Sequence, residues 1–117
     1  MKLQGKAKML RIHVEEADKW EGVPLYQAIV DKCRALDIAG ATVYRALEGF
    51  GASSLIHKAH WVGLSSDQPV MVSIVDTEEN LRRLFPVLDE MLDEGLIAIS
   101  EVEVIKYVHQ QENGVRE

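Results

Sequence analysis

Residues 70–75 read Val-Met-Val-Ser-Ile-Val, and apolar residues at helical spacing follow over residues 81–92. The first stretch is apolar at every position but Ser73, which is typical of a central strand with both faces in need of cover. Asp76 or Thr77 can cap the helix that follows, because both side chains accept hydrogen bonds from a helix N-terminus. This stretch predicts a buried strand joined directly to an amphipathic helix.

The predicted helix contains a proline. Pro86 removes one backbone donor from the apolar stripe, so we expect a bend there rather than a second helix. Gly95 is expected to end the helix. Residues 96–108 then read as the last strand, which is long enough to hold a bulge or break near Ser100 and Glu101.

The first half of the chain has the same order of elements. Residues 7–15 place apolar side chains at every second position, the pattern of a strand with one buried side. A helix is expected to begin at Pro24 and to end before Gly40, and residues 41–48 read as a second strand. A long connection over residues 52–69 follows, and connections of this length are usually functional or mobile.

The chain thus contains two consecutive strand–helix–strand units. This is the order of an α+β, ferredoxin-like βαββαβ fold, with both helices on one face of an antiparallel sheet. The second sheet face is left open, and its apolar residues need burial, so we expect another subunit to cover it. Residues 1–109 are predicted to form this one domain, with the long loop 52–69, and residues 110–117 a flexible C-terminal tail.

Composition narrows the possible functions. The chain has 117 residues, near the usual size of one domain, and a net charge of −6 without a basic run, so we expect no nucleic-acid partner. Cys33 is the single cysteine and can form no intrachain disulfide, which suits a reducing compartment. The first residues lack the apolar core of a signal peptide, and no segment is long enough to cross a bilayer. We expect a cytoplasmic protein without direct membrane insertion.

Two short motifs resemble the PII superfamily of signalling proteins. Gly40-Ala41-Thr42-Val43 and Gly49-Phe50-Gly51 are similar to a PII strand that ends in Gly-Phe-Gly before the long T-loop. More narrowly, about residues 5–108 resemble the domain-of-unknown-function-190 (UPF0166-type) family of PII-like proteins. That resemblance also rests on Lys19-Trp20, Pro24-Leu25-Tyr26, Ser54, Ile56-His57, Pro69-Val70, Pro86-Val87-Leu88 and Glu103-Val104-Ile105-Lys106-Tyr107.

The resemblance implies a ferredoxin-like homotrimer with ligand sites in the clefts between subunits, where PII proteins bind adenine nucleotides. It also hints at a membrane-transport client of the fluoride-exporter type, because some relatives are encoded beside or fused to such proteins. No cofactor is obligatory under this reading, and AMP or ADP is the expected effector.

Carried over by residue, the resemblance places Thr42, Gly49, Phe50 and Gly51 on the edge of the nucleotide cleft, and Gly95 at the start of the last strand. Gly49 and Gly51 can take backbone angles that aim successive amides at a phosphate. Further candidate ligand-binding residues are Ala52, Ser53, Ser54, His57 and Lys106.

Two departures from the PII pattern affect the choice of ligand. Ala52 and Ser53 stand where PII proteins usually have a basic and an amide residue. The glycine-rich, lysine-bearing phosphate loop of PII is shortened to Asp93-Glu94-Gly95, whose carboxylates would repel a phosphate. A mono- or diphosphate is therefore easier to accommodate than a triphosphate.

The main alternative is a metal-binding or purely structural trimer of the CutA-like type, motivated by four histidines. His57 and His60 are three residues apart, and His13 and His109 complete the set, but no carboxylate or thiolate stands at matching spacing, and we predict no metal site. Nor does the sequence contain a nucleophile and base with an orienting third group, so we expect no enzymatic activity. Trp20 is expected to pin its loop to the core or to a neighbour.

Overall fold

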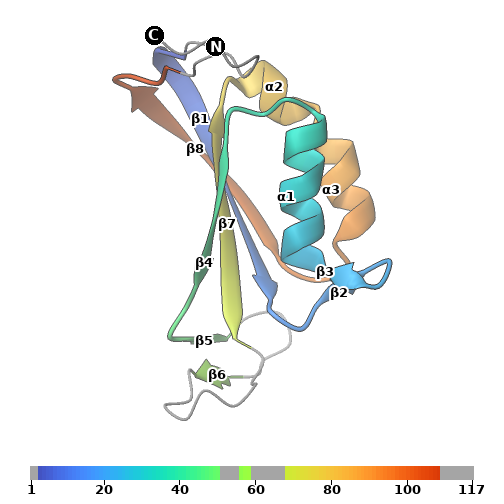
Figure 1. The fold of residues 1–117 in the computed structure, drawn as a ribbon. Helices are drawn as coiled ribbons and strands as arrows, with labels where there is room; N and C mark the ends of the chain where they lie inside the picture. Colours follow the sequence, from blue (N-terminus) through green and yellow to red (C-terminus); the bar gives the residue numbers. More distant parts are fainter. Residues whose placement is uncertain (1–2, 51–55, 59–67, 109–117) are drawn as a thin grey trace, which may run out of the picture.

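In the described residues, four strands form one antiparallel sheet in the order β4-β7-β1-β8, and three helices lie together on one face of it (Figure 1). The structure is a computed structural model that describes residues 3–50, 56–58 and 68–108. The strand order is that of a ferredoxin-like fold, which confirms the α+β prediction. The sheet strands are β1 (Gly5–Glu15), β4 (Ala41–Arg45), β7 (Pro69–Asp76) and β8 (Leu96–Val104); the helices are α1 (Leu25–Ala35), α2 (Glu78–Arg82) and α3 (Phe85–Met91).

The core lies between the sheet and the helices. Alternate residues of β7 are fully or almost fully buried there, and Leu10, Ile12 and Val14 of β1 are buried beside them. The other phase of β7, with Met71 and Val75, is only half-buried. The apolar run therefore does mark a strand central to the sheet, with helices covering one of its faces within the protomer.

The helix after β7 is divided in two, so the prediction of a single bent helix is wrong. Thr77 caps α2 as predicted, and its hydroxyl accepts a hydrogen bond from Asn80 N at 3.2 Å. The chain then tightens, with Leu84 N donating to Leu81 O at 2.9 Å, three residues back. Pro86 cannot donate to the carbonyl four residues before it, so α3 starts afresh with Pro86 in its first turn.

Three other boundaries differ from the sequence prediction. The predicted strand 41–48 ends at Arg45, and a separate strand, β5 (Glu48–Phe50), pairs with β6 (Ile56–Lys58). β8 runs through Ser100 and Glu101 without a break, because its pairing with β1 continues in register there. The helix ends at Met91 rather than at Gly95.

A short hairpin that the sequence analysis did not predict precedes α1. It joins β2 (Lys19–Trp20) to β3 (Val23–Pro24) through Glu21 and Gly22, whose φ values of 50° and 85° are those of a type I′ turn. Trp20 packs against the core, and Lys32 Nζ lies 5.2 Å from the centre of its ring. The tryptophan therefore fixes the hairpin to α1, within the protomer.

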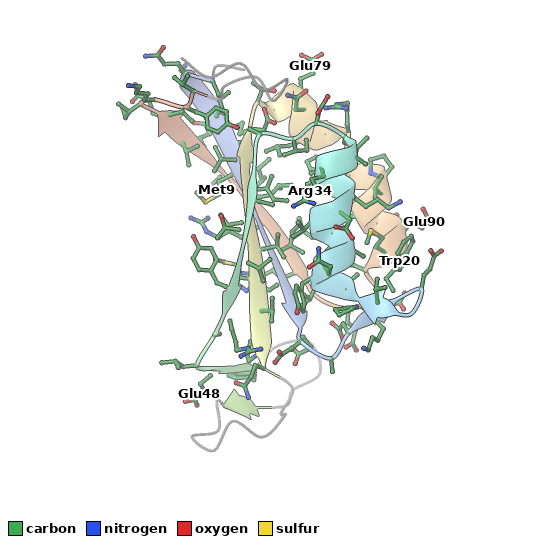
Figure 2. The ribbon with its side chains drawn as sticks, viewed as in Figure 1. Met9, Trp20, Arg34, Glu48, Glu79 and Glu90 are labelled. Carbon is green, nitrogen blue, oxygen red and sulfur yellow. The ribbon has the colours of Figure 1, made fainter. Side chains whose placement is uncertain are left out.

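The sheet face opposite the helices, here called the open face, carries Met9, which points away from the helices in Figure 2. Paired residues of neighbouring strands lie side by side on this face. Leu96 is 57% exposed and Tyr44 51% exposed, so large apolar side chains of both outer strands reach solvent. From β4 to β8, three rows of paired residues cross the face: Val75, Met9 and Ser100; Thr42, Ser73, Arg11 and Ala98; and Tyr44, Met71, His13 and Leu96.

At the end of the sheet near α2, buried Asp76 ties three segments together. Its carboxylate accepts hydrogen bonds from Ala39 N at 2.8 Å, Thr77 N at 2.6 Å and Asn80 Nδ2 at 3.0 Å. Tyr107 Oη donates to Ala39 O at 2.8 Å, which holds the segment after β8 against the start of β4. These contacts, called the Asp76 cluster below, satisfy backbone groups where strands and helices meet.

Candidate functional site

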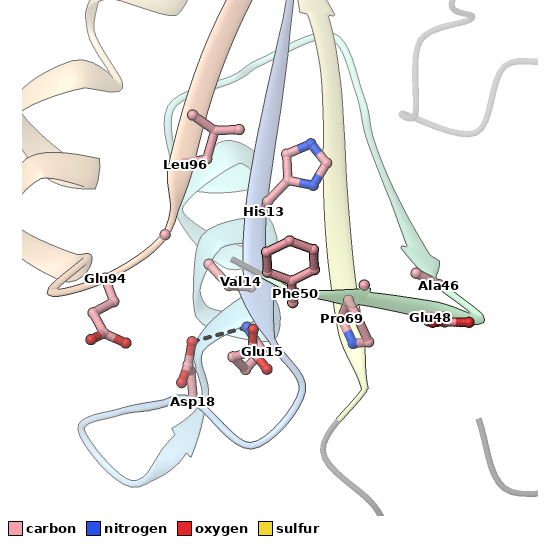
Figure 3. A pocket seen from close by; sticks show the side chains of 12 residues that line it. His13, Val14, Glu15, Asp18, Ala46, Glu48, Phe50, Pro69, Glu94 and Leu96 are labelled. Atoms are coloured by element: carbon pink, nitrogen blue, oxygen red, sulfur yellow. Dashed lines mark hydrogen bonds between the residues drawn. The ribbon is translucent and has the colours of Figure 1, made fainter. Parts of the chain in front are cut away.

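A hollow of about 310 Å³ lies at the opposite end of the sheet, where β1 ends and β8 begins (Figure 3). β5 and the start of β7 close its other side. Its lining comes from segments far apart in the sequence: His13, Val14, Glu15, Asp18, Ala46, Glu48, Gly49, Phe50, Pro69, Glu94, Gly95 and Leu96. In one protomer, the volume of the hollow is at the lower end of the range for small-molecule sites, which is large enough for a small ligand.

Gly95 fixes the wall where β8 starts. Its φ is +139°, and a Cβ at this position would lie 2.6 Å from the carbonyl oxygen of His13. Only glycine allows the two backbones to approach so closely at this angle. This close approach explains why a glycine stands at the predicted start of the last strand.

The hollow is acidic. Glu15, Asp18, Glu48 and Glu94 line it, and His13 is its only described residue that can carry a positive charge. Asp18 is partly engaged, since its carboxylate accepts a hydrogen bond from Glu15 N at 2.9 Å. A group of several negative charges would be repelled here unless cations from elsewhere approach.

Phe50 supplies the hollow with an aromatic surface. Its side chain is 75% exposed, and in the view of Figure 3 its ring lies between His13 and Pro69. The nearby Ala46 N donates to Pro69 O at 2.8 Å, which fixes the turn between β4 and β5 to the start of β7. An exposed phenylalanine held beside a hollow can stack against a planar ring.

The structure brings together only some of the predicted ligand-binding residues. Gly49, Phe50 and Gly95 all line the hollow. Thr42 lies on the open face in β4 and does not line it. Lys106 follows β8 at the other end of the sheet, beside the segment that pairs with the start of β1.

The remaining candidates fall in or beside the long loop. His57 lies in β6, where its backbone pairs with Gly49. Gly51, Ala52, Ser53 and Ser54 lie outside the described residues, as do His60, His109 and most of the loop 52–69. Their predicted roles, and the predicted tail 110–117, stay predictions.

Gly49 does not have the backbone conformation that the anion-nest hypothesis assumed for it. Among the described glycines, positive φ occurs at Gly5, Gly22 and Gly95 and not at Gly49, which lies in an ordinary strand. A Cβ on Gly49 would make normal contact with Pro69 Cγ at 3.4 Å. The first half of the proposed nest is therefore absent in this protomer.

Sequence reasoning found the glycines but missed most of the acidic lining. Glu15, Asp18 and Glu48 come from three different segments, and no local pattern joins them. Only Glu94 was singled out, because it adjoins Gly95. Within residues 3–50, 56–58 and 68–108, no group of three His, Cys, Asp or Glu side chains is arranged to hold a metal ion.

Cys33 lies in α1 and does not line the hollow. It is buried in the core, and burial raises the pKa of its thiol to about 11. At neutral pH it is protonated, as expected for a cysteine that packs as a small apolar side chain.

None of the helices in the described part of the chain is long and apolar enough to span a membrane.

Similarity to solved structures defines the class of fold. CPII, a nitrogen regulatory PII-like protein from Thiomonas intermedia K12, solved with ADP, AMP and bicarbonate, superposes with a TM-score of 0.66 at 20% sequence identity, over 85% of this chain and 88% of that one. CutA from Synechococcus elongatus PCC7942 has a TM-score of 0.54 at 14% identity, over 92% of this chain and 85% of that one. The fold is thus shared by PII-like and CutA proteins.

The chain belongs to the DUF190 family, described as "Uncharacterized ACR, COG1993", whose model matches residues 7–104. Two UPF0166 proteins, from Aquifex aeolicus and Methanocaldococcus jannaschii, are each 38% identical to it over 102 residues, which cover 86% of this chain and 94% of each relative. The family expected from the sequence is confirmed, and the likeness to PII-like proteins is one of fold.

Proposed function

We propose that this protein is a non-enzymatic PII-like regulator that binds AMP or ADP in clefts between copies of the chain, with the hollow at Gly49, Phe50 and Gly95 forming one wall. The observation that carries the proposal is the exposed ring of Phe50 beside a hollow whose wall includes the close-packed backbone at Gly95. The fold shared with CPII, which was solved with ADP and AMP, supports it.

The charge of the hollow sets an order among nucleotides. With Glu15, Asp18, Glu48 and Glu94 around it, each added phosphate meets more repulsion. AMP should bind more tightly than ADP, and ADP more tightly than ATP. A planar base beside Phe50 carries no such penalty, so the base rather than the phosphate supplies the main attraction.

A second copy of the chain is needed for a closed cleft, because the hollow alone is open and small. The exposed apolar residues Tyr44 and Leu96 on the open face favour association, since large contiguous apolar surfaces are rarely left to water. A closed homotrimer is the assembly that we propose, with the open faces directed toward one another. The membrane-transport client implied by the resemblance stays a prediction.

Calorimetric titration with AMP, ADP and ATP tests the proposal. We expect measurable heat with AMP, weaker binding of ADP and the weakest binding of ATP. Phe50→Ala should weaken AMP binding by about 5- to 150-fold, since loss of one base–aromatic stack costs roughly 1–3 kcal/mol. Leu47→Ala is a matched control, because Leu47 is similarly exposed, at 79%, but does not line the hollow.

Glu94→Gln probes the charge of the hollow. Removing one carboxylate should strengthen ADP about twofold relative to AMP, because two unit charges about 8 Å apart in water interact with roughly 0.5 kcal/mol. Equal affinity of all three nucleotides in the unmodified protein would contradict the electrostatic order. No heat and no thermal shift with any of them would reject the nucleotide itself.

A further inference from the structure

The middle row of the open face is polar, whereas the rows on both sides of it are largely apolar. Thr42, Ser73, Arg11 and Ala98 lie side by side across all four strands of the sheet. Two hydroxyls and a guanidinium thus cross the centre of the face. The rows on both sides of them are mainly apolar, with Val75, Met9, Tyr44, Met71 and Leu96, and with Ser100 and His13 as their polar members. A polar row of this composition contributes little to apolar packing and calls for another explanation.

Arg11 is the key member of this row. Its side chain is half-buried, and Nη1 donates to Ser100 Oγ at 3.3 Å. A guanidinium has five N–H donors in a planar fork. Within the part of the chain that the structure describes, Ser100 is the only hydrogen-bond partner of this guanidinium, and no carboxylate lies within ion-pair distance of it.

Among the described residues, the rows of the open face around Arg11 contain no acid that could neutralise it. Across the three rows, the described side chains of the open face include no aspartate or glutamate, and His13 is the only other side chain there that can carry a positive charge. The carboxylates of β8, Glu101 and Glu103, pair with Lys8 and Lys6 of β1, in the phase that faces the helices.

Assembly would make this isolated charge costly. Resting on the proposed assembly, in which open faces meet, the partner of Arg11 would be the same face of another copy. That face brings another Arg11 and no carboxylate from these rows. Burying a charge without a counter-charge is strongly unfavourable, and facing like charges add repulsion.

We infer that the row of Thr42, Ser73 and Arg11, together with Ser100, forms a binding site for an oxyanion of the phosphate or sulfate type between copies of the chain. A planar guanidinium can hold such an anion with two parallel hydrogen bonds, and serine and threonine hydroxyls can donate to its other oxygens. The anion neutralises Arg11 and links the copies, so assembly and anion binding are coupled. This site is distinct from the acidic hollow at the end of the sheet.

The test compares sulfate with chloride at equal ionic strength on the full chain, with thermal unfolding and light-scattering mass as readouts. The unmodified protein should remain oligomeric, and its Tm should rise saturably in millimolar sulfate, by about 4 °C or more. Arg11→Gln should lose the saturable rise. Arg34→Gln, which removes the same charge from the exposed surface of α1, should keep it. Parallel curves for the two variants would overturn the site.

Arg11→Lys keeps the charge but loses the planar fork, and it decides the matter if Arg11→Gln does not fold. Its sulfate response should fall to less than half that of Arg34→Gln, and an equal response would overturn the inference. A protein that is monomeric at every sulfate concentration would overturn both the assembly and the site. An oligomer whose Tm is indifferent to sulfate would overturn the site alone.

Titration with AMP separates a free oxyanion from the phosphate of a nucleotide. If the two sites are distinct, Arg11→Gln should bind AMP as the unmodified protein does, while Phe50→Ala loses AMP and keeps the sulfate response. Loss of AMP binding in Arg11→Gln would assign the oxyanion to the nucleotide and overturn a separate site.

Discussion

The two ends of the sheet differ in what their polar groups do. At the Asp76 cluster, a fully buried carboxylate accepts hydrogen bonds from three donors, on Ala39, Thr77 and Asn80, and Tyr107 adds a hydrogen bond to the carbonyl oxygen of Ala39. At the hollow, Glu48 and Glu94 are exposed around an open space. The first end uses its polar groups to hold the fold together, and the second leaves Glu48 and Glu94 exposed to solvent.

The difference predicts that mutations will separate stability from binding. Substitutions at the Asp76 cluster should lower the free energy of unfolding and act on ligands only through the fold. Substitutions of side chains around the hollow should change binding with little effect on stability. Gly95 is the exception, because its role at the hollow is carried by the backbone.

Asp76→Asn should have the largest effect on stability. The amide removes one acceptor from the N–H groups of Ala39 and Thr77 and turns a donor toward them, so we expect a loss of about 4 kcal/mol, as for other broken buried charge networks. Urea denaturation measures it. Asp89→Asn on the exposed surface of α3 is the control. Similar midpoints for the two variants would show that the two ends do not differ as described.

Gly95→Ala should cost about 3 kcal/mol, because the added Cβ meets the His13 carbonyl at 2.6 Å in a backbone region that disfavours side chains. Gly40→Ala, whose Cβ would meet nothing within 4 Å, should change the urea midpoint far less. If both variants are equally stable, the backbone around Gly95 and His13 can shift to accommodate the added methyl group, contrary to this prediction.

Cys33 makes the core sensitive to alkaline pH. Its thiol has a pKa of about 11 in the folded protein against 9.0 as the ordinary value, because burial disfavours the thiolate. The folded state therefore holds its proton longer, and the stability from this group is complete below pH 9 and is lost as the pH rises toward 11, by up to about 2.5 kcal/mol. Cys33→Ala should flatten this part of the stability curve, measured by urea denaturation from pH 8 to 11. A slope unchanged by the substitution would contradict it.

Gly49→Ala should have the smallest effect, below about 0.5 kcal/mol, because glycine is not required by the backbone there and the new methyl makes ordinary contact with Pro69. Thermal unfolding checks this directly. A large loss of stability would show that β5 and its neighbours are more tightly packed than their geometry indicates, and would weaken the contrast between the two ends.

Much of the fold could be predicted from periodicity. The alternation in β1 and the apolar run of β7 reflect burial against helices, and Thr77 acts through a local cap, so sequence neighbours are enough to find them. The division of α2 from α3 was missed because a proline can either bend or end a helix, and packing decides between the two. The β2–β3 hairpin was missed because Glu21, unlike Gly22, is not a usual residue for positive φ.

The site was harder to predict than the fold. The motif around Gly49 and Phe50 led to the end of the sheet where the hollow lies, but the acidic character of the hollow depends on segments that only the folded chain brings together. Lys106 is expected near the phosphate because it falls within the predicted last strand, residues 96–108, although β8 ends at Val104. The antiparallel register places it at the far end instead, since β8 starts at the hollow and runs away from it.

The register of β1 with β8 also determines at which end of the molecule a label or tether can be attached. Leu3 N donates to Tyr107 O at 3.1 Å, so the described chain begins and finishes at one end of the molecule, and the hollow lies at the other (Figure 1). An affinity label, a fluorophore or a tether to a sensor chip joined at either of these residues would therefore be attached at the end of the sheet remote from the hollow. Protein immobilised in this way should therefore keep the hollow exposed to the solution.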